Sequence, residues 1–149
     1  MQLNNKVFSI FYLYLQHNLI KRRILINTKY YKLIDKIRAE IAANGITTAI
    51  IDDLKAMRVM VIAENQPLLA KVIRLIFQHV EEHETFNVAI PDDEPIEGHE
   101  EEQVLSTEIN PVESLDYLLS SMIDVTKSSN ELDIRGFVAD LKEQAGEDW

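Results

Sequence analysis

Residues 47–83 read TTAIIDDLKAMRVMVIAENQPLLAKVIRLIFQHVEEH, and this stretch decides the fold. Apolar residues recur in it mostly three or four positions apart, a spacing that places them on one face of an α-helix. They are Ile50, Ile51, Leu54, Met57, Val61, Leu68, Val72, Ile76 and Val80. An unbroken helix over 48–83 would be about 54 Å long, whereas a compact domain of this size has a radius of gyration of about 14 Å. Pro67 lacks a backbone N–H, so we expect it to kink or break the helix near Asn65.

The segment immediately upstream carries a second helical pattern. From Thr28 onward, apolar residues share one face and charged residues lie elsewhere. The apolar set is Leu33, Ile34, Ile37 and Ile41. Asn44-Gly45 then supplies a residue suited to the left-handed conformation at which helices often end. Thr47 and Thr48 are suitable caps for the helix that follows.

Two further helices are predicted near the C-terminal end. Asn110-Pro111 followed by Glu113 combines a capping side chain, a proline at the first helical position and a glutamate that can bond back to the cap. Ser128 with Glu131 repeats the capping pattern. The apolar stripes are Val112, Leu115, Leu119, Met122 and Ile123 in the first helix, and Ile134, Val138 and Leu141 with Phe137 beside them in the second. We therefore predict an all-α fold, a compact bundle of four to five helices around one core.

Two segments lack a sustained period. Residues 1–27 are aromatic and then basic, and both a helix with an irregular end and a pair of short strands remain possible there. We treat 1–27 as an irregular N-terminal arm, separate from a helical domain over 28–149. Residues 84–109 include a run, 92–102, in which seven of eleven residues are acidic. Because like charges at this density repel and keep the backbone solvated, we expect a mobile acidic loop at 84–109.

Composition is that of one globular domain. The chain has 149 residues, of which 46% are apolar, enough to bury a core. It contains no cysteine, which excludes disulfides and thiolate sites and is compatible with a reducing compartment. The apolar run Val7–Leu15 is far shorter than the roughly 20 residues of a membrane span and is not followed by small residues suited to signal cleavage. We expect a cytoplasmic protein.

The net charge of −10 is unevenly distributed. Residues 1–40 hold eight Lys/Arg against two acidic residues, a balance of +6, and residues 41–149 hold seven against twenty-three, a balance of −16. An acidic body repels nucleic acid and anionic membranes, so either partner would have to dock on the basic arm. The arm could equally lie on the acidic surface of its own chain or of a sister chain.

One motif suggests metal chemistry. His79-Val80-Glu81-Glu82-His83 matches H-x-x-E-H, and so resembles the inverted zinc-protease pattern. His79 and His83 lie one helical turn apart and could chelate a metal, with Glu82 nearby as a base. A chain this short leaves little room for a substrate cleft or for a distant third ligand. The alternative interpretation is a solvated helix end that enters an acidic loop.

Other resemblances are shorter. Residues 57–69 resemble the opening strand and first helix of a response-regulator receiver, with Glu64 in its acidic corner, but no phosphoacceptor Asp stands where that family requires one. Four consecutive apolar residues at 59–62 favour a buried helix instead. Residues 41–48 resemble the turn of a helix-turn-helix, yet the following residues 49–53 present carboxylates where nucleic acid requires Arg, Lys, Asn or Gln. A helix–helix corner fits better.

No pattern in the chain combines the groups that an enzyme needs. We therefore expect a non-enzymatic helical protein–protein interaction or adaptor protein, without a cofactor, that binds a protein partner or itself, with the arm as the first contact surface. One alternative is a metal-dependent hydrolase or metal-binding protein that uses His79, Glu82 and His83. Another is nucleic-acid or membrane-surface binding through the basic arm.

Overall fold

Helices account for every regular element in the part of the chain that the structure describes, which confirms the predicted all-α class. The structure is a computed structural model that describes the backbone of residues 3–91 and 108–147 and the side chains of residues 9–17, 30–91 and 108–147. In chain order the elements are α1 (Leu3–Asn44), the short 3-10 helix η1 (Thr48–Ile50), α2 (Ile51–Ala63), α3 (Pro67–His83), α4 (Pro111–Ser121) and α5 (Ser128–Ala145).

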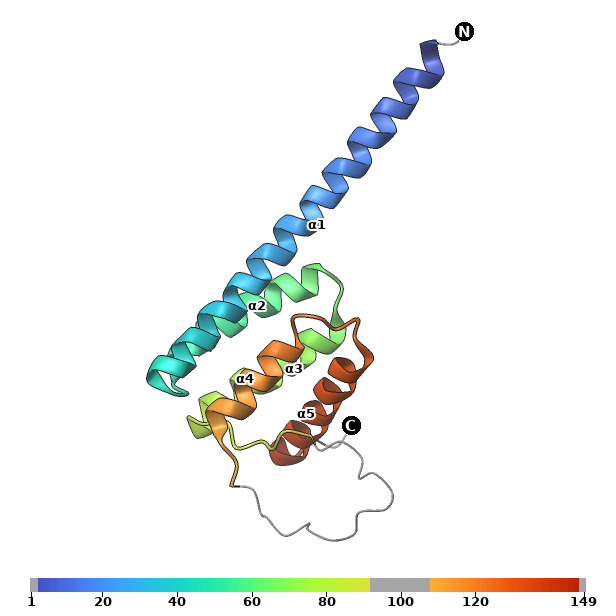
Figure 1. Ribbon diagram of the computed structural model, residues 1–149. Coiled ribbons are helices and arrows are strands. Elements are labelled where there is room, and N and C mark those ends of the chain that lie inside the picture. Colours follow the sequence, from blue (N-terminus) through green and yellow to red (C-terminus); the bar gives the residue numbers. More distant parts are fainter. Residues whose placement is uncertain (1–2, 92–107, 148–149) are drawn as a thin grey trace, which may run out of the picture.

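Helix α3 is central to the packing, because it lies against both α2 and α5. Helix α1 packs against α2 and α4, and α4 packs against α5. In Figure 1 only the C-terminal part of α1 lies along the bundle, and its N-terminal part extends well beyond the other helices. The most enclosed core side chains come from every helix and include Ile34, Ile37 and Ile41 of α1, Leu54 and Met57 of α2, Ile73 and Ile76 of α3, Leu115 of α4 and Phe137 of α5.

The corner between α1 and α2 forms as its sequence predicts. Gly45 adopts the left-handed conformation (φ 73°), and its N–H donates to the carbonyl of Ile41 at 3.0 Å. Thr47 caps η1, since its side-chain oxygen accepts from the N–H of Ala49 at 3.3 Å. Helix α2 then begins with Asp52 in its first turn, where a negative charge is stabilised by the helix dipole.

The stripe over 48–83 is divided between two helices at Pro67. Helix α2 ends at Ala63, Asn65 turns the chain with a positive φ of 58°, and Pro67 occupies the first turn of α3. Residues 59–62 are helical, not a strand. The expectation that all four are buried was wrong, because Val59 and Ile62 are 67% and 50% exposed on the outer face of α2.

The prediction of an irregular N-terminal arm at 1–27 was wrong for the described residues, since α1 is one helix from Leu3 to Asn44. Residues 1–44 contain neither glycine nor proline, so nothing in the local sequence interrupts the backbone hydrogen bonds. The side chains of residues 9–17 are all exposed, so no face of this part of the helix packs on a core. Without such packing, the sequence has no reason to concentrate its apolar residues on one face. Local propensity therefore forms this part of the helix without amphipathic patterning.

The predicted mobile loop at 84–109 also needs correction over its first residues. Phe86 and Val88 are fully buried between α3, α4 and α5. The Ser114 hydroxyl donates to the carbonyl of Val88, and the Gln144 amide donates to the carbonyl of Asn87 at 3.0 Å. Residues 84–91 are thus a loop, as predicted, but one that is anchored in the core by Phe86 and Val88 while Glu84, Asn87 and Ala89 are exposed. The acidic run at 92–102 lies outside the described residues.

The two C-terminal helices differ in how they begin. Asn110 caps α4 as predicted, with its side-chain oxygen accepting from the N–H of Glu113 at 3.3 Å. The predicted cap at Ser128 was wrong: Ser128 is already helical, and the preceding Lys127 makes no side-chain capping bond. The turn before α5 is ordered instead by Asp124, whose side chain accepts from the hydroxyl and N–H of Thr126 at 2.6 and 3.2 Å.

Candidate functional site

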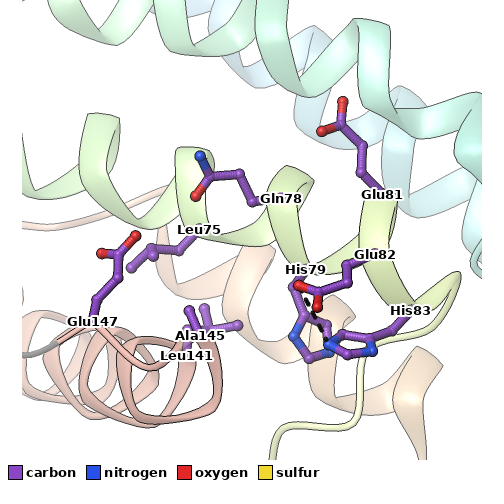
Figure 2. Close-up of a pocket in the computed structure, with 9 residues that line it drawn as sticks. All are labelled: Leu75, Gln78, His79, Glu81, Glu82, His83, Leu141, Ala145 and Glu147. Carbon is purple, nitrogen blue, oxygen red and sulfur yellow. Dashed lines mark ion pairs between the residues drawn. The ribbon is translucent and has the colours of Figure 1, made fainter.

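A cleft of about 440 Å³ lies between the last turns of α3 and the C-terminal end of α5. Figure 2 shows the residues that line it, with the two histidines and Glu82 at one end and α5 side chains at the other. The lining residues are Leu75, Gln78, His79, Glu81, Glu82 and His83 from α3, Leu141 and Ala145 from α5, and Glu147 just beyond it. The contribution of α5 was missed from the sequence, because 44 residues separate the end of α3 at His83 from the start of α5 at Ser128.

His79 forms the buried wall of this cleft. It is only 7% exposed, and its Nε2 atom has no hydrogen-bond partner among the described residues. Its ring lies edge-on to Phe86, with centroids 5.7 Å apart, and 4.5 Å from the ring of His83. Burial lowers the pKa of His79, the proximity of His83 lowers it further, and Glu82 opposes these effects. The imidazole of His79 is therefore neutral near pH 7.

His83 and Glu82 lie at the open end of the cleft. The Nε2 atom of His83 is 3.8 Å from a carboxylate oxygen of Glu82, and the two side chains are 44% and 72% exposed. Helix α3 ends here because Glu84 adopts the left-handed conformation (φ 51°), with its N–H donating to the carbonyl of Val80 at 2.9 Å. The structure thus brings the two predicted histidines together, with Glu82 beside His83.

The chemistry available at this site is ligand binding by imidazole and carboxylate. Within residues 3–91 and 108–147, no group of three His, Asp or Glu side chains already stands close enough to hold a metal ion. Two other carboxylates at the cleft are engaged in ion pairs, Glu81 with Lys55 at 2.8 Å and Glu147 with Arg74 at 3.3 Å. The cleft residues that are not held in these ion pairs include the neutral imidazole of His79, whose Nε2 atom has no partner among the described residues, and the neighbouring imidazole of His83.

A second candidate surface is the projecting part of α1. Six consecutive apolar side chains are exposed there, with exposed fractions from 46% to 67%. They are Ile10, Phe11, Tyr12, Leu13, Tyr14 and Leu15. We call this segment the α1 apolar segment. The run of aromatic residues in the sequence pointed to it, but only the structure shows that it is helical and uncovered in the single chain.

Among the described residues, no helix combines the length and the apolar character that crossing a bilayer requires. Comparisons of the chain with protein-family models, with curated proteins and with solved structures found no match.

Proposed function

We propose that this protein is a non-enzymatic helical interaction protein that associates with a second copy of itself through the α1 apolar segment. The observation that supports this proposal is the exposure of six consecutive apolar side chains on the part of α1 that extends beyond the bundle (Figure 1). An exposed contiguous apolar surface on a monomer commonly marks an interaction site.

The apolar side chains of this segment surround the helix, so a partner can pack on any side of it. Successive residues of an α-helix are rotated by about 100°, so residues 10–15 cover the whole circumference. A helix that is apolar all round is normally buried in a large core or in a membrane. A second copy of α1 offers an equally apolar surface, and in a pair each helix covers about half of the circumference of the other.

The energetics favour a partner that contributes apolar surface of its own. Fully burying one large apolar side chain contributes about 1.5–3 kcal/mol, and these side chains are already about half covered by their own helix, which leaves about 1 kcal/mol each. In a symmetric pair each copy buries about three of the six side chains against the other, which gives about 6 kcal/mol in total. Association costs about 4–15 kcal/mol in lost freedom. Self-association can therefore be favourable, whereas a polar partner would contribute only half of the gain.

Charge selects the orientation of the pair. Positions 21–23 of α1 are Lys21, Arg22 and Arg23. In a parallel pair these positions would lie about 10 Å apart, the usual distance between packed helix axes. In an antiparallel pair centred on Leu13 they would lie about 27 Å apart, because each is about nine residues from the centre at about 1.5 Å per residue. That separation exceeds the Debye length of about 8 Å in physiological salt, so we propose an antiparallel arrangement.

Light scattering at several protein concentrations tests the proposal. We expect the unmodified protein to be a dimer at high concentration and Phe11→Gln/Leu13→Gln to be monomeric. Phe11 and Leu13 lie about 200° apart on the helix, so the double substitution removes an apolar side chain from either face. One buried side chain lost from each copy is about 2 kcal/mol for the pair, which corresponds to a dissociation constant about thirtyfold higher. Glutamine is a good helix former, so the helix content measured by circular dichroism should not change.

A matched control makes the same chemical change elsewhere. Val59→Gln/Ile62→Gln removes the two exposed apolar side chains of α2 and should leave the dissociation constant unchanged. An unmodified protein that stays monomeric at every concentration contradicts the proposal. If both pairs of substitutions raise the dissociation constant of the dimer equally, the α1 apolar segment is not the interface.

Two alternative functions remain proposals. A metal-dependent hydrolase would use His79 and His83 as ligands with Glu82 as the base, and it requires metal-dependent cleavage of a substrate. Binding of nucleic acid or a membrane surface through the basic residues of 1–27 requires a steep dependence on salt that deletion of this segment abolishes. The exposed apolar side chains favour self-association over both.

A further inference from the structure

A second pocket, of about 330 Å³, lies at the turn between α2 and α3 (Figure 1). Three of the eight residues that line it are cations, Arg58, Lys71 and Arg74, and none is acidic. In the whole chain the acidic residues outnumber Lys and Arg by 25 to 15. A pocket lined by cations alone is therefore a local exception to the charge of the molecule, and its field attracts an anion.

Arg58 is held in place at this pocket by the backbone of α3. Its Nε–H donates to the carbonyl of Ala70 at 3.2 Å, which joins α2 to the first turns of α3. This bond uses one of the five N–H donors of the guanidinium group. Arg58 forms no ion pair with a carboxylate in the described part of the chain, so nothing there compensates its charge.

The other two cations stand among like charges. Lys71 and Arg74 are three residues apart on α3 and so share one side of the helix. Desolvation lowers the pKa of Lys71, the charges of Lys142 and Arg74 lower it further, and Glu147 opposes them. A bound anion would relieve this repulsion between positive charges.

The charge at the pocket matches that of a phosphate monoester. Arg58, Lys71 and Arg74 contribute three positive charges, and Glu147, which is 3.3 Å from Arg74, offsets one of them. A phosphate monoester carries a charge of about −1.5 to −2 at pH 7 and has three strongly accepting oxygens. The fork of N–H donors on a guanidinium group fits these oxygens, and a single carboxylate would neutralise only half of the charge.

The pocket also has an apolar wall that a phosphate group alone would not use. Ile62, Pro67 and Ala70 form this wall, and the side chain of Ile62 is 50% exposed. Pockets of about 300–1,000 Å³ typically hold small organic molecules, with an apolar wall against the body of the ligand and a few polar groups that orient it. The pocket therefore fits a phosphate that carries an organic group.

We propose that the pocket between α2 and α3 binds a small, soluble phosphate monoester, with Arg58, Lys71 and Arg74 holding the phosphate and Ile62 and Pro67 contacting the apolar organic group. The dipole of α3, which begins at Pro67, adds to the attraction for a negative charge. The proposal is independent of self-association, because no residue that lines the pocket belongs to α1.

Isothermal titration calorimetry of the full-length protein in a phosphate-free buffer tests the site. The probe is phenyl phosphate, and we expect it to bind more tightly than inorganic phosphate, whereas phenol should not bind. A rise in Tm on addition of phenyl phosphate is the second measurement, since a ligand that binds only the folded state stabilises it. Phosphatidylcholine vesicles with and without phosphatidic acid, which presents the same phosphate chemistry on a lipid surface, are tested by sedimentation, and the protein should not bind to either.

Single substitutions locate the bound phosphate. Lys71→Gln removes one cation from a group of like charges and should fold, and we expect it to raise the dissociation constant of phenyl phosphate about tenfold or more. Arg58→Gln should have a similar effect, provided that circular dichroism shows a folded protein. The matched control is Lys36→Gln, which makes the same change of charge on α1 at a residue that does not line the pocket, and it should leave the dissociation constant unchanged.

Four results overturn the proposal. The first is the absence of phenyl phosphate binding in both the calorimetric and the Tm measurements. The second is binding that Lys71→Gln leaves intact, or that Lys36→Gln weakens equally, because the phosphate would then not lie in this pocket. The third is equally tight binding of phenol, which would exclude a role for the phosphate. The fourth is binding to vesicles that contain phosphatidic acid without binding of phenyl phosphate, which would indicate a membrane surface as the partner.

Discussion

The close approach of residues 84–91 to α5 leads to a prediction with an unusual sign. A Cβ atom placed on Gly136, in the middle of α5, would lie 2.8 Å from Cγ and 3.1 Å from Cβ of Pro91. Replacing a helical glycine by alanine normally stabilises a protein by about 1 kcal/mol, because alanine has a much higher helix propensity. At Gly136 we expect the opposite, since the added methyl group overlaps a ring whose position is fixed by the backbone.

The magnitude follows from two opposing terms. Overpacking of a filled contact costs about 1–3 kcal/mol, and a contact of 2.8 Å with a rigid proline ring belongs near the upper end of that range. Subtracting the gain in helix propensity of about 1 kcal/mol leaves a net loss of about 1–2 kcal/mol for Gly136→Ala. For a protein of this length that loss lowers Tm by several degrees, about 2–4 °C per kcal/mol.

A double-mutant cycle by urea denaturation tests the origin of this loss. Pro91→Gly removes both proline atoms that the new methyl group would meet, and Phe86 and Val88 still anchor the segment in the core. In the Pro91→Gly background, Gly136→Ala should therefore stabilise the protein by up to about 1 kcal/mol. If Gly136→Ala stabilises the unmodified protein, or destabilises both backgrounds equally, residues 84–91 do not pack on α5 as described.

Two further predictions concern buried polar groups. Burial and the nearby His83 lower the pKa of His79 in the folded state below the unfolded value of about 6.5. The folded state therefore binds fewer protons than the unfolded state near this pH. We expect the protein to lose stability as the pH falls below about 6.5. Denaturation at a series of pH values between about 7.5 and 6 should show this loss of stability, and His79→Leu should reduce it. Burial raises the pKa of Glu64, so protonation of Glu64 at lower pH favours the folded state and opposes the effect of His79. Tyr30→Phe should cost about 1–3 kcal/mol, since the Tyr30 hydroxyl donates to the carbonyl of Met122 at 3.0 Å in the core and its removal leaves that carbonyl unpartnered. Urea denaturation should give a lower midpoint for Tyr30→Phe, and a smaller change for the neighbouring Tyr31→Phe.

The helix ends that sequence predicted correctly depend on interactions between near neighbours. Gly45 and Pro67 act through their own backbone conformations, and Asn110 reaches only to Glu113. The same reasoning failed at Ser128, because Asp124 orders the preceding turn and the helix starts one residue earlier than a serine cap requires. A capping pattern shows that a cap can form, but not that the helix begins at the residue after it.

The N-terminal half of α1 could not be predicted from periodicity for a physical reason. Apolar patterning records which face of a helix packs on a core, and residues 9–17 pack on none within the single chain. The absence of glycine and proline from residues 1–44 was the available signal for a continuous helix. Apolar periodicity indicates which face of a helix is buried, whereas helix propensity indicates whether a helix forms. For the exposed residues 9–17, only helix propensity was informative.

Residues 84–91 and the cleft depend on contacts that no local pattern records. The spacing of His79 and His83 predicted that they share a helix face, but not that Phe86 and α5 would cover one ring and leave the other accessible. Only two alternating side chains, Phe86 and Val88, are fully buried in the packed segment. Two residues are too few to give a recognisable period beside an acidic run.

Two features of the molecule are places where the chain departs from what stability alone favours. An unpartnered buried polar atom such as Nε2 of His79 costs about 1–3 kcal/mol, a large share of a net stability of about 5–15 kcal/mol. Six exposed apolar side chains on α1 add nothing to the stability of the single chain. Departures of this kind are expected where a protein binds something else.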